Sequence, residues 1–258
     1  MARANERAAA ARSSPAAVAA LERTAAGAPI PPSFKDALRR ADVAVVAEVK
    51  RRSPSKGEIN RALSAPAQAA AYAGGGASAI SVLTEPDDFG GSLDDLRAAR
   101  AAVSVPLLRK DFIVDEVQLL EARAAGASAV LLIARAISPS VLERLAAFAL
   151  GLSLDALIEV RDEAELDRAL AAGTGVVGVN SRDLETLAID PAVSERLVPR
   201  IPGACVALWE SGVRDVDGVR RAARSGADAV LVGSVLSGSV DPRAAVRALV
   251  GVPKVARG

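Results

Sequence analysis

The chain has 258 residues, a length that fits one large domain or two small ones. Its 32 basic and 31 acidic residues nearly cancel, and no run of lysine or arginine is interleaved with aromatic residues, which argues against nucleic-acid binding. Half of the residues are hydrophobic but only 2% are aromatic, a composition typical of alanine-rich helices packed on a sheet of valine, leucine and isoleucine.

Histidine is absent, which excludes Ser-His-Asp and Cys-His nucleophile systems and histidine metal sites. Acid-base chemistry must therefore fall to Lys, Glu, Asp or Tyr. The single Cys205 excludes an internal disulfide and fits a reducing compartment. No apolar stretch reaches the ~20 residues of a membrane helix. We therefore expect a cytoplasmic protein with no membrane or nucleic-acid partner.

Residues 1–42 precede the first predicted strand, and we expect them to form a helical extension packed on the domain that follows. A helical pattern covers 14–27, and a proline-rich bend separates it from a second short helix at 33–40. The first dozen residues are rich in alanine and charge, a composition typical of disordered termini.

Short runs rich in β-branched residues and leucine follow the extension at intervals of 20 to 35 residues, and they predict eight strands. Segments between them begin with helix-capping residues and often end in glycine. The predicted strands are 43–50, 78–83, 105–110, 128–134, 154–160, 175–180, 205–210 and 228–233, and the predicted caps are Ser92, Asp115, Ser138, Asp162, Asp190, Asp215 and Asp241.

Continuous apolar strands that alternate with helices indicate a parallel sheet covered on its outer side. Eight such units predict a (β/α)8 TIM barrel over residues 43–258, as a single catalytic domain. A doubly wound open sheet is the alternative. It usually has fewer strands and needs a glycine-rich first turn, which is absent after Lys50.

Polar residues end most of the predicted strands, where a parallel barrel places its active site. Lysine is rare in this chain, with only five residues, yet two of them close strands. An ammonium can donate a proton once its surroundings lower its pKa, which a guanidinium effectively cannot do. The strand-end residues are Glu48, Lys50, Lys110, Glu159, Asn180, Glu210 and Gly233.

Two short glycine turns follow the last two predicted strands, where barrels often bind phosphate. Ser211-Gly212 follows the seventh strand and Gly233-Ser234 the eighth, so their backbone N–H groups can approach an anion. Ser53, in the loop after the first strand, adds a hydroxyl. We therefore expect a phosphorylated small-molecule substrate.

Seven segments, taken in order, resemble the motifs of the indole-3-glycerol-phosphate synthase family, from about residue 43 to 250. They are AEVKRRSPSKGEI, SVLTEPDDFGGS, PLLRKDFIVDEVQLLEARAAGASAVLLI, ALIEV, VGVNSRDLETL, WESGV and GADAVLVGSVL. The resemblance implies closure of the indole ring of 1-(2-carboxyphenylamino)-1-deoxyribulose 5-phosphate, with loss of carbon dioxide and water, in tryptophan biosynthesis. It implies no metal and no organic cofactor.

The same resemblance assigns roles to the strand-end residues. Lys110 matches the general acid, Glu159 the base, and Lys50 the lysine that contacts the substrate carboxylate. Glu48, Asn180 and Glu210 match polar groups that orient the others. Substrate-binding positions are implied for Ser53, Phe89, Phe112, Arg182, Ser211, Gly212, Gly233 and Ser234, with the two phenylalanines as the wall for the aromatic ring.

Three positions depart from the family pattern. Ser181 replaces an asparagine, Phe89 stands alone where two phenylalanines are usual, and Trp209 replaces a small residue. These changes bear on substrate affinity more than on the type of reaction.

Other functions are open from the residues alone. A phosphoribosylanthranilate isomerase would need a cysteine at the end of a strand, whereas Cys205 begins one. A class I aldolase would use Lys50 or Lys110 as a Schiff-base nucleophile. A non-catalytic sugar-phosphate-binding barrel need not keep Lys50, Lys110 and Glu159 together. Other tryptophan-pathway enzymes are the candidate protein partners.

Overall fold

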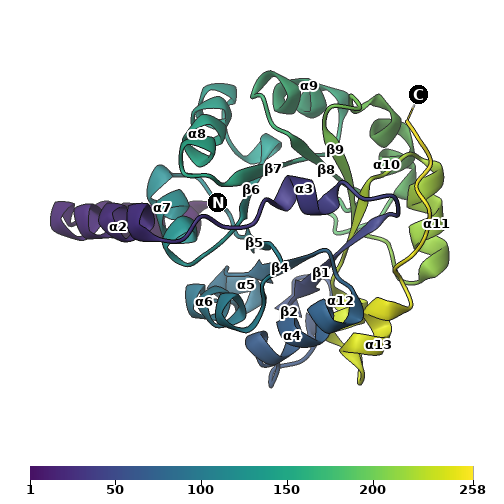
Figure 1. Cartoon of the computed structure of the whole chain (residues 1–258). Coiled ribbons are helices and arrows are strands. Elements are labelled where there is room, and N and C mark those ends of the chain that lie inside the picture. The colour runs from purple at the N-terminus through teal and green to yellow at the C-terminus, as the bar shows by residue number, and fades with distance from the viewer. Residues whose placement is uncertain (258) are drawn as a thin grey trace.

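Eight parallel strands close into a barrel in the computed structural model, which describes residues 1–257 (Figure 1). Gly258, the last residue of the expected barrel domain, lies outside the described residues. Neighbouring strands follow the order of the chain, and β1 closes the ring by pairing with both β4 and β10. The prediction of a (β/α)8 TIM barrel is confirmed. The strands are β1 (Ala44–Val49), β4 (Ala79–Leu83), β5 (Leu107–Lys110), β6 (Ala129–Ile133), β7 (Asp155–Val160), β8 (Val176–Asn180), β9 (Val206–Glu210) and β10 (Ala229–Val232).

Helices cover the outside of the barrel, and all seven predicted caps are used. In each case a Ser or Asp side chain accepts a hydrogen bond from a backbone N–H of the first turn, which has no partner within the helix. The helices are α4 (Ala65–Gly75), α6 (Leu93–Ala102), α7 (Glu116–Ala124), α8 (Pro139–Gly151), α9 (Glu163–Ala171), α10 (Pro191–Leu197), α11 (Val216–Arg224) and α13 (Pro242–Arg247), with the short α5 (Pro86–Phe89), α12 (Ser234–Ser237), η1 (Ala134–Ala136) and η2 (Val198–Arg200).

Strand alternation divides the apolar residues into two cores. On β8, Val177 and Val179 face the helices, whereas Val176 faces the barrel interior. The inner core is closed at one end by α3 (Phe34–Leu38), whose Phe34 and Leu38 are fully buried against residues at the starts of the strands. In Figure 1 this helix lies across the near end of the barrel. The carboxyl ends of the strands therefore face the opposite side.

The N-terminal extension spans both ends of the barrel. α2 (Pro15–Gly27) packs beside α7, and α1 (Ala2–Arg12) reaches the loops that follow β4 and β5. The expectation of disorder in the first dozen residues is wrong. Ala4 and Ala8 are buried, and Arg12 forms an ion pair with Asp115 at 3.0 Å, so this segment has packing and charge partners that its composition does not reveal.

Two smaller features lie outside the predicted elements. The loop after β1 contains a short hairpin, β2 (Arg52–Ser53) paired with β3 (Gly57–Glu58). The C-terminal tail returns beneath β1, where the Val252 carbonyl accepts a hydrogen bond from the Val43 N–H at 2.8 Å. Among residues 1–257, no helix combines the length and hydrophobicity needed to cross a membrane.

Candidate active site

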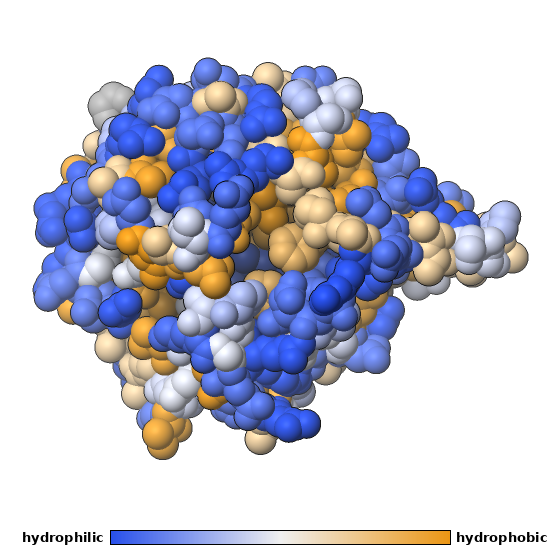
Figure 2. All heavy atoms as spheres, turned by 180° about the vertical axis from the view of Figure 1, so that it is seen from behind, coloured by the Kyte–Doolittle hydropathy of each residue, from blue (hydrophilic) through white to orange (hydrophobic). Residues whose placement is uncertain are grey.

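A lysine from β5 lies among three glutamates that come from three other strands of the barrel. Lys110 Nζ is 2.5 Å from Glu210 Oε2, and 3.9 Å from one carboxylate oxygen of both Glu48 and Glu159. All four side chains point inward at the carboxyl ends of their strands, where Figure 2 shows a hollow in the face opposite α3. The structure thus brings together strand-end residues that the sequence predicted to converge.

The glutamates determine the charge state of Lys110. Burial alone would lower the pKa of its ammonium, but Glu210, Glu48 and Glu159 together raise the pKa well above its ordinary value. A lowered pKa, the condition under which the sequence analysis gave a strand-end lysine a role in proton donation, is therefore not met at Lys110. Three carboxylates within 4 Å outweigh the loss of solvent, and this lysine stays protonated.

Glu159 has the opposite perturbation. Burial and the neighbouring negative charge of Glu210 raise the pKa of its carboxyl to about 7, although Lys110 lowers it. Glu48 differs, because burial is outweighed by Lys50 and Lys110 and its pKa is lowered. The cluster therefore combines a lysine that stays protonated, Lys110, with one carboxyl, Glu159, that can gain and lose a proton near neutral pH.

A second ion pair lies beside this cluster, on β1. Lys50 Nζ is 2.5 Å from Glu48 Oε1, as expected for residues two apart that point to the same side. Gly233 makes room for this pair, because a Cβ at that position would overlap Glu48 Oε1 and lie 2.8 Å from Lys50 Nζ. Ser237 of α12 fixes the strand end, since its hydroxyl donates to the Glu48 carbonyl at 2.8 Å.

Asn180 and Arg182 shape the loop after β8. The Asn180 side chain accepts a hydrogen bond from the Arg182 N–H at 2.9 Å, and the Arg182 guanidinium donates to the Leu187 carbonyl at 2.9 Å. Leu184, at the tip of this loop, is 40% exposed, and it lines a small cavity together with Glu159 and Asn180. The sequence prediction missed this leucine, because an apolar residue in a loop has no signal of its own.

The predicted phosphate turns follow adjacent strands, β9 and β10. Ser211 and Gly212 both have positive φ, 66° and 86°, a strained conformation for serine and an observation that points to a functional turn. Gly233 and Ser234 begin α12. Ser53 lies in the β2 hairpin, and its buried hydroxyl has no hydrogen-bond partner among the described residues.

Phe89 and Phe112 face each other across two neighbouring loops. Their ring centroids are 6.5 Å apart and the rings are tilted by 53°. Both loops are held by one residue of α1, because Arg7 contacts Glu85 at 3.3 Å and Asp111 at 3.2 Å. Arg7 was not predicted, since its partners lie 78 and 104 residues away in the sequence.

Of the three residues that depart from the family pattern, two have side chains that point away from the carboxylate cluster. Ser181 is buried against α10, and its hydroxyl lies 2.7 Å from that of Ser194. Trp209 packs in the outer core and donates its indole N–H to the Ser211 carbonyl at 3.0 Å. Neither change therefore alters the inward-facing surface.

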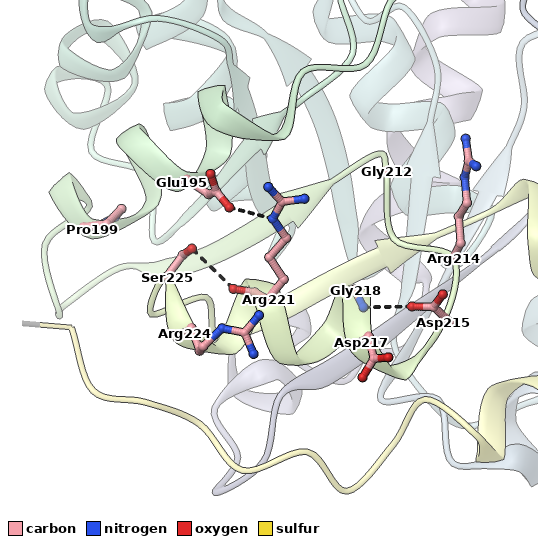
Figure 3. A pocket seen from close by; sticks show the side chains of 10 residues that line it. All are labelled: Glu195, Pro199, Gly212, Arg214, Asp215, Asp217, Gly218, Arg221, Arg224 and Ser225. Atoms are coloured by element: carbon pink, nitrogen blue, oxygen red, sulfur yellow. Dashed lines mark hydrogen bonds and ion pairs between the residues drawn. The ribbon is translucent and has the colours of Figure 1, made fainter.

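Other features lie apart from the cluster. Cys205 precedes β9, at the α3 end of the barrel, and donates to the Thr174 carbonyl at 3.4 Å. A pocket of about 860 Å³ lies between α10 and α11 (Figure 3). It is lined mainly by charged residues, among them Arg214, Arg221 and Glu195, and Gly212 is the only predicted site residue in its wall.

Comparison with known proteins decides the family. Residues 1–249 match the family model described as indole-3-glycerol phosphate synthase. The chain belongs to the indole-3-glycerol phosphate synthase family. The resemblance stated from seven motifs is thus confirmed, and the match also includes the N-terminal extension, for which the sequence motifs gave no evidence.

Relatives of this family extend over most of the chain. An indole-3-glycerol phosphate synthase of a Nocardioides species is 54% identical over 83% of this chain and 82% of its own length. Indole-3-glycerol phosphate synthase 2 of Streptomyces coelicolor is 49% identical over 90% of both chains. Among solved structures, thiamine phosphate pyrophosphorylase from Pyrococcus furiosus matches with a TM-score of 0.61 at 17% identity, covering 84% of this chain and 96% of that one. This last similarity concerns the fold alone.

Proposed function

We propose that the chain closes the indole ring of 1-(2-carboxyphenylamino)-1-deoxyribulose 5-phosphate, with Lys110 as the general acid and Glu159 as the base. Membership of the indole-3-glycerol phosphate synthase family supports the reaction. The observation that supports the residue roles is the inward-facing cluster, in which one largely buried ammonium lies within 4 Å of three carboxylates.

The first step forms a carbon–carbon bond between the aromatic ring and the ribulose carbonyl carbon. Negative charge develops on the carbonyl oxygen, and Lys110 gives that oxygen a proton. A raised pKa makes Lys110 a weak acid toward water, but an alkoxide is a far stronger base than an amine, so the transfer remains favourable. The glutamates ensure that the proton is present when the bond forms.

Carbon dioxide then leaves from the ring carbon that formed the bond, which leaves its electron pair to the ring. The hydroxyl made in the first step takes a second proton, from Lys50 or from Lys110 once it is protonated again, and departs as water, while a base removes a proton from the adjacent carbon to complete the double bond. Glu159 has a pKa of about 7 and comes from a different strand than Lys110, so it can accept a proton near neutral pH without first taking the one on the acid.

Binding of the substrate is divided among the surrounding loops. The aromatic ring lies against Phe89 and Phe112, its carboxylate is paired with Lys50, and Arg182 lies nearby. The phosphate is held by Ser53 and by the turns at Ser211-Gly212 and Gly233-Ser234. The strained φ of Ser211 and the unpartnered Ser53 hydroxyl support this assignment.

The remaining expectations form part of the same proposal. The catalytic unit is the barrel from residue 43 onward, with residues 1–42 as an extension packed on it. We place the protein in the cytoplasm, with other tryptophan-pathway enzymes as its candidate partners, and this assignment rests on the family alone.

No observation favours an isomerase, because Cys205 lies at the far end of the barrel. A Schiff-base aldolase would need an unprotonated lysine, which the carboxylates around Lys110 oppose.

The test follows indole fluorescence after the carboxyphenylamino substrate is added to the purified chain. We expect product from the wild type, and a loss of several orders of magnitude in kcat for Lys110→Ala with substrate affinity kept within about tenfold. Lys110→Arg is the matched control for charge, and it should also fail because guanidinium is a poor proton donor. Near-normal turnover in either variant would contradict the assignment of the acid.

A further inference from the structure

A glycine in the middle of β8 occupies an inward-facing position of the barrel. Gly178 pairs in register with Glu159 on β7 and with Leu208 on β9. A Cβ at this position would overlap Glu210 Oε1 and lie 3.0 Å from Leu157 Cδ1. The carboxylate of Glu210 therefore lies directly over the glycine backbone.

The space at Gly178 has a clear effect on the cluster. Glu210 reaches Lys110 with one oxygen at 2.5 Å and extends its other oxygen over Gly178, which is the strand neighbour of Glu159. That second oxygen is buried and accepts no hydrogen bond from a donor group among residues 1–257, and the negative charge of Glu210 acts on the neighbouring Glu159. The absence of a side chain at residue 178 is what allows it to be there.

We propose that Gly178 is a positioning residue for the reaction, because its missing side chain lets the Glu210 carboxylate lie beside Lys110 and over the strand neighbour of Glu159. The inference rests on the proposed function of this cluster. A glycine inside a strand is unfavourable for folding, and such glycines mark places where another group approaches the backbone closely. Here the group that approaches is the carboxylate that pairs with the catalytic acid.

A methyl group at this position would displace Glu210. Ordinary contacts of a Cβ start at 3.4 Å, so the Glu210 oxygen would have to move by about 1 Å, and a misplacement of about 1 Å can cost on the order of 100-fold in rate. Glu210 is only 1% exposed, so the carboxylate has no solvent into which it can turn. The ion pair between Lys110 and Glu210 and the negative charge next to Glu159 would therefore change together.

The experiment is a double-mutant cycle on purified full-length protein. We expect Gly178→Ala to lower kcat on the order of 100-fold with little change in KM. Glu210→Asp has a shorter side chain that does not reach residue 178, so adding Gly178→Ala to it should lower kcat by less than about threefold. Gly151→Ala is the matched control, because its Cβ would meet no atom within 4 Å, and it should retain wild-type kinetics.

Two results would overturn the proposal. The first is a loss from Gly178→Ala that is equally large in the Glu210→Asp background. The second is rescue by Leu157→Val, which removes the other close contact and would make the effect ordinary core packing. Melting temperatures of the same variants provide a readout without activity: Gly178→Ala should lower Tm in the wild type and much less in Glu210→Asp. Because unfolding needs no substrate, these melting temperatures test the contact between Gly178 and Glu210 even if the proposed reaction is not observed.

The pH dependence of kcat offers a further readout that simple misfolding would not produce. Displacing Glu210 reduces the negative charge near Glu159, so the acidic limb of the profile should shift to lower pH in Gly178→Ala. The other charged groups around Glu159 remain in place: they are Lys110 and, in the wall of the small cavity, Arg135, Arg161, Glu165 and Arg182. An unchanged limb together with a large loss of kcat would count against the proposal.

Discussion

Replacing Glu159 with glutamine should abolish dehydration and, at alkaline pH, stabilise the fold. The pKa of Glu159 is raised from 4.5 to about 7, so between these values the unfolded chain has lost a proton that the folded chain keeps. The free energy of unfolding therefore falls as the pH rises through this window. At about 1.4 kcal/mol per pKa unit, ionised Glu159 costs the fold about 3 kcal/mol at pH 8 and less than about 1 kcal/mol at pH 5.

The assay compares urea unfolding of the wild type and Glu159→Gln at both pH values, with the fluorescence of the single, buried Trp209 as the signal. Comparing variants at each pH cancels the other titrating groups. We expect the variant to be about 3 kcal/mol more stable at pH 8, or roughly 6 to 12 °C in Tm for a domain of this size, with only a small gain at pH 5. Glu143 is exposed, so Glu143→Gln is the control, and its free energy of unfolding should stay within about 0.5 kcal/mol of the wild-type value at both pH values. A difference independent of pH, or a variant less stable at pH 8, would refute the raised pKa of Glu159.

Three further outcomes test the site. Gly233→Ala should lower kcat as well as raise KM, because its methyl group would displace the Glu48 and Lys50 pair; an effect on KM alone would show that the residue serves only the phosphate. Arg7→Ala should raise KM and destabilise the protein by about 1 to 2 kcal/mol in thermal unfolding, because it leaves the buried carboxylates of Glu85 and Asp111 without this partner. Arg3 is mostly exposed, so Arg3→Ala should change neither KM nor stability. Sulfate should compete with substrate and bind between the ends of β9 and β10 in soaked crystals; sulfate found only at surface arginines would contradict the phosphate site.

The strands and helix caps could be predicted because their signals are local. An apolar run such as 129–133 and a cap such as Asp162 are each specified by a few neighbouring residues. The convergence of Lys110, Glu159 and Glu210 could also be predicted, because the carboxyl ends of parallel strands in a closed barrel must meet at one end.

The electrostatics of the site could not be predicted in the same way. Whether the pKa of Lys110 rises or falls depends on distances to carboxylates up to 100 residues away, and the sequence does not contain those distances. The contacts of Arg7 and the approach of Glu210 to Gly178 are equally nonlocal. Both depend on side chains meeting across loops or across the barrel interior, where spacing in the sequence has no predictive value.

The pairing of β1 with β10, here called the seam of the barrel, has a consequence during synthesis of the chain. One edge of β1 can pair with β4 once residue 83 has left the ribosome, but its other edge waits for residues 229–232. The nascent protein therefore carries an apolar strand, AVVAEV, with an open edge until residues 229–232 have been made, and such an edge is a template for wrong pairing. Closure is completed by residues that follow the last strand, because Lys254 and Arg257 both bind Asp228, just before β10. A nascent chain that lacks this tail has its strands but lacks the ion pairs that secure the seam.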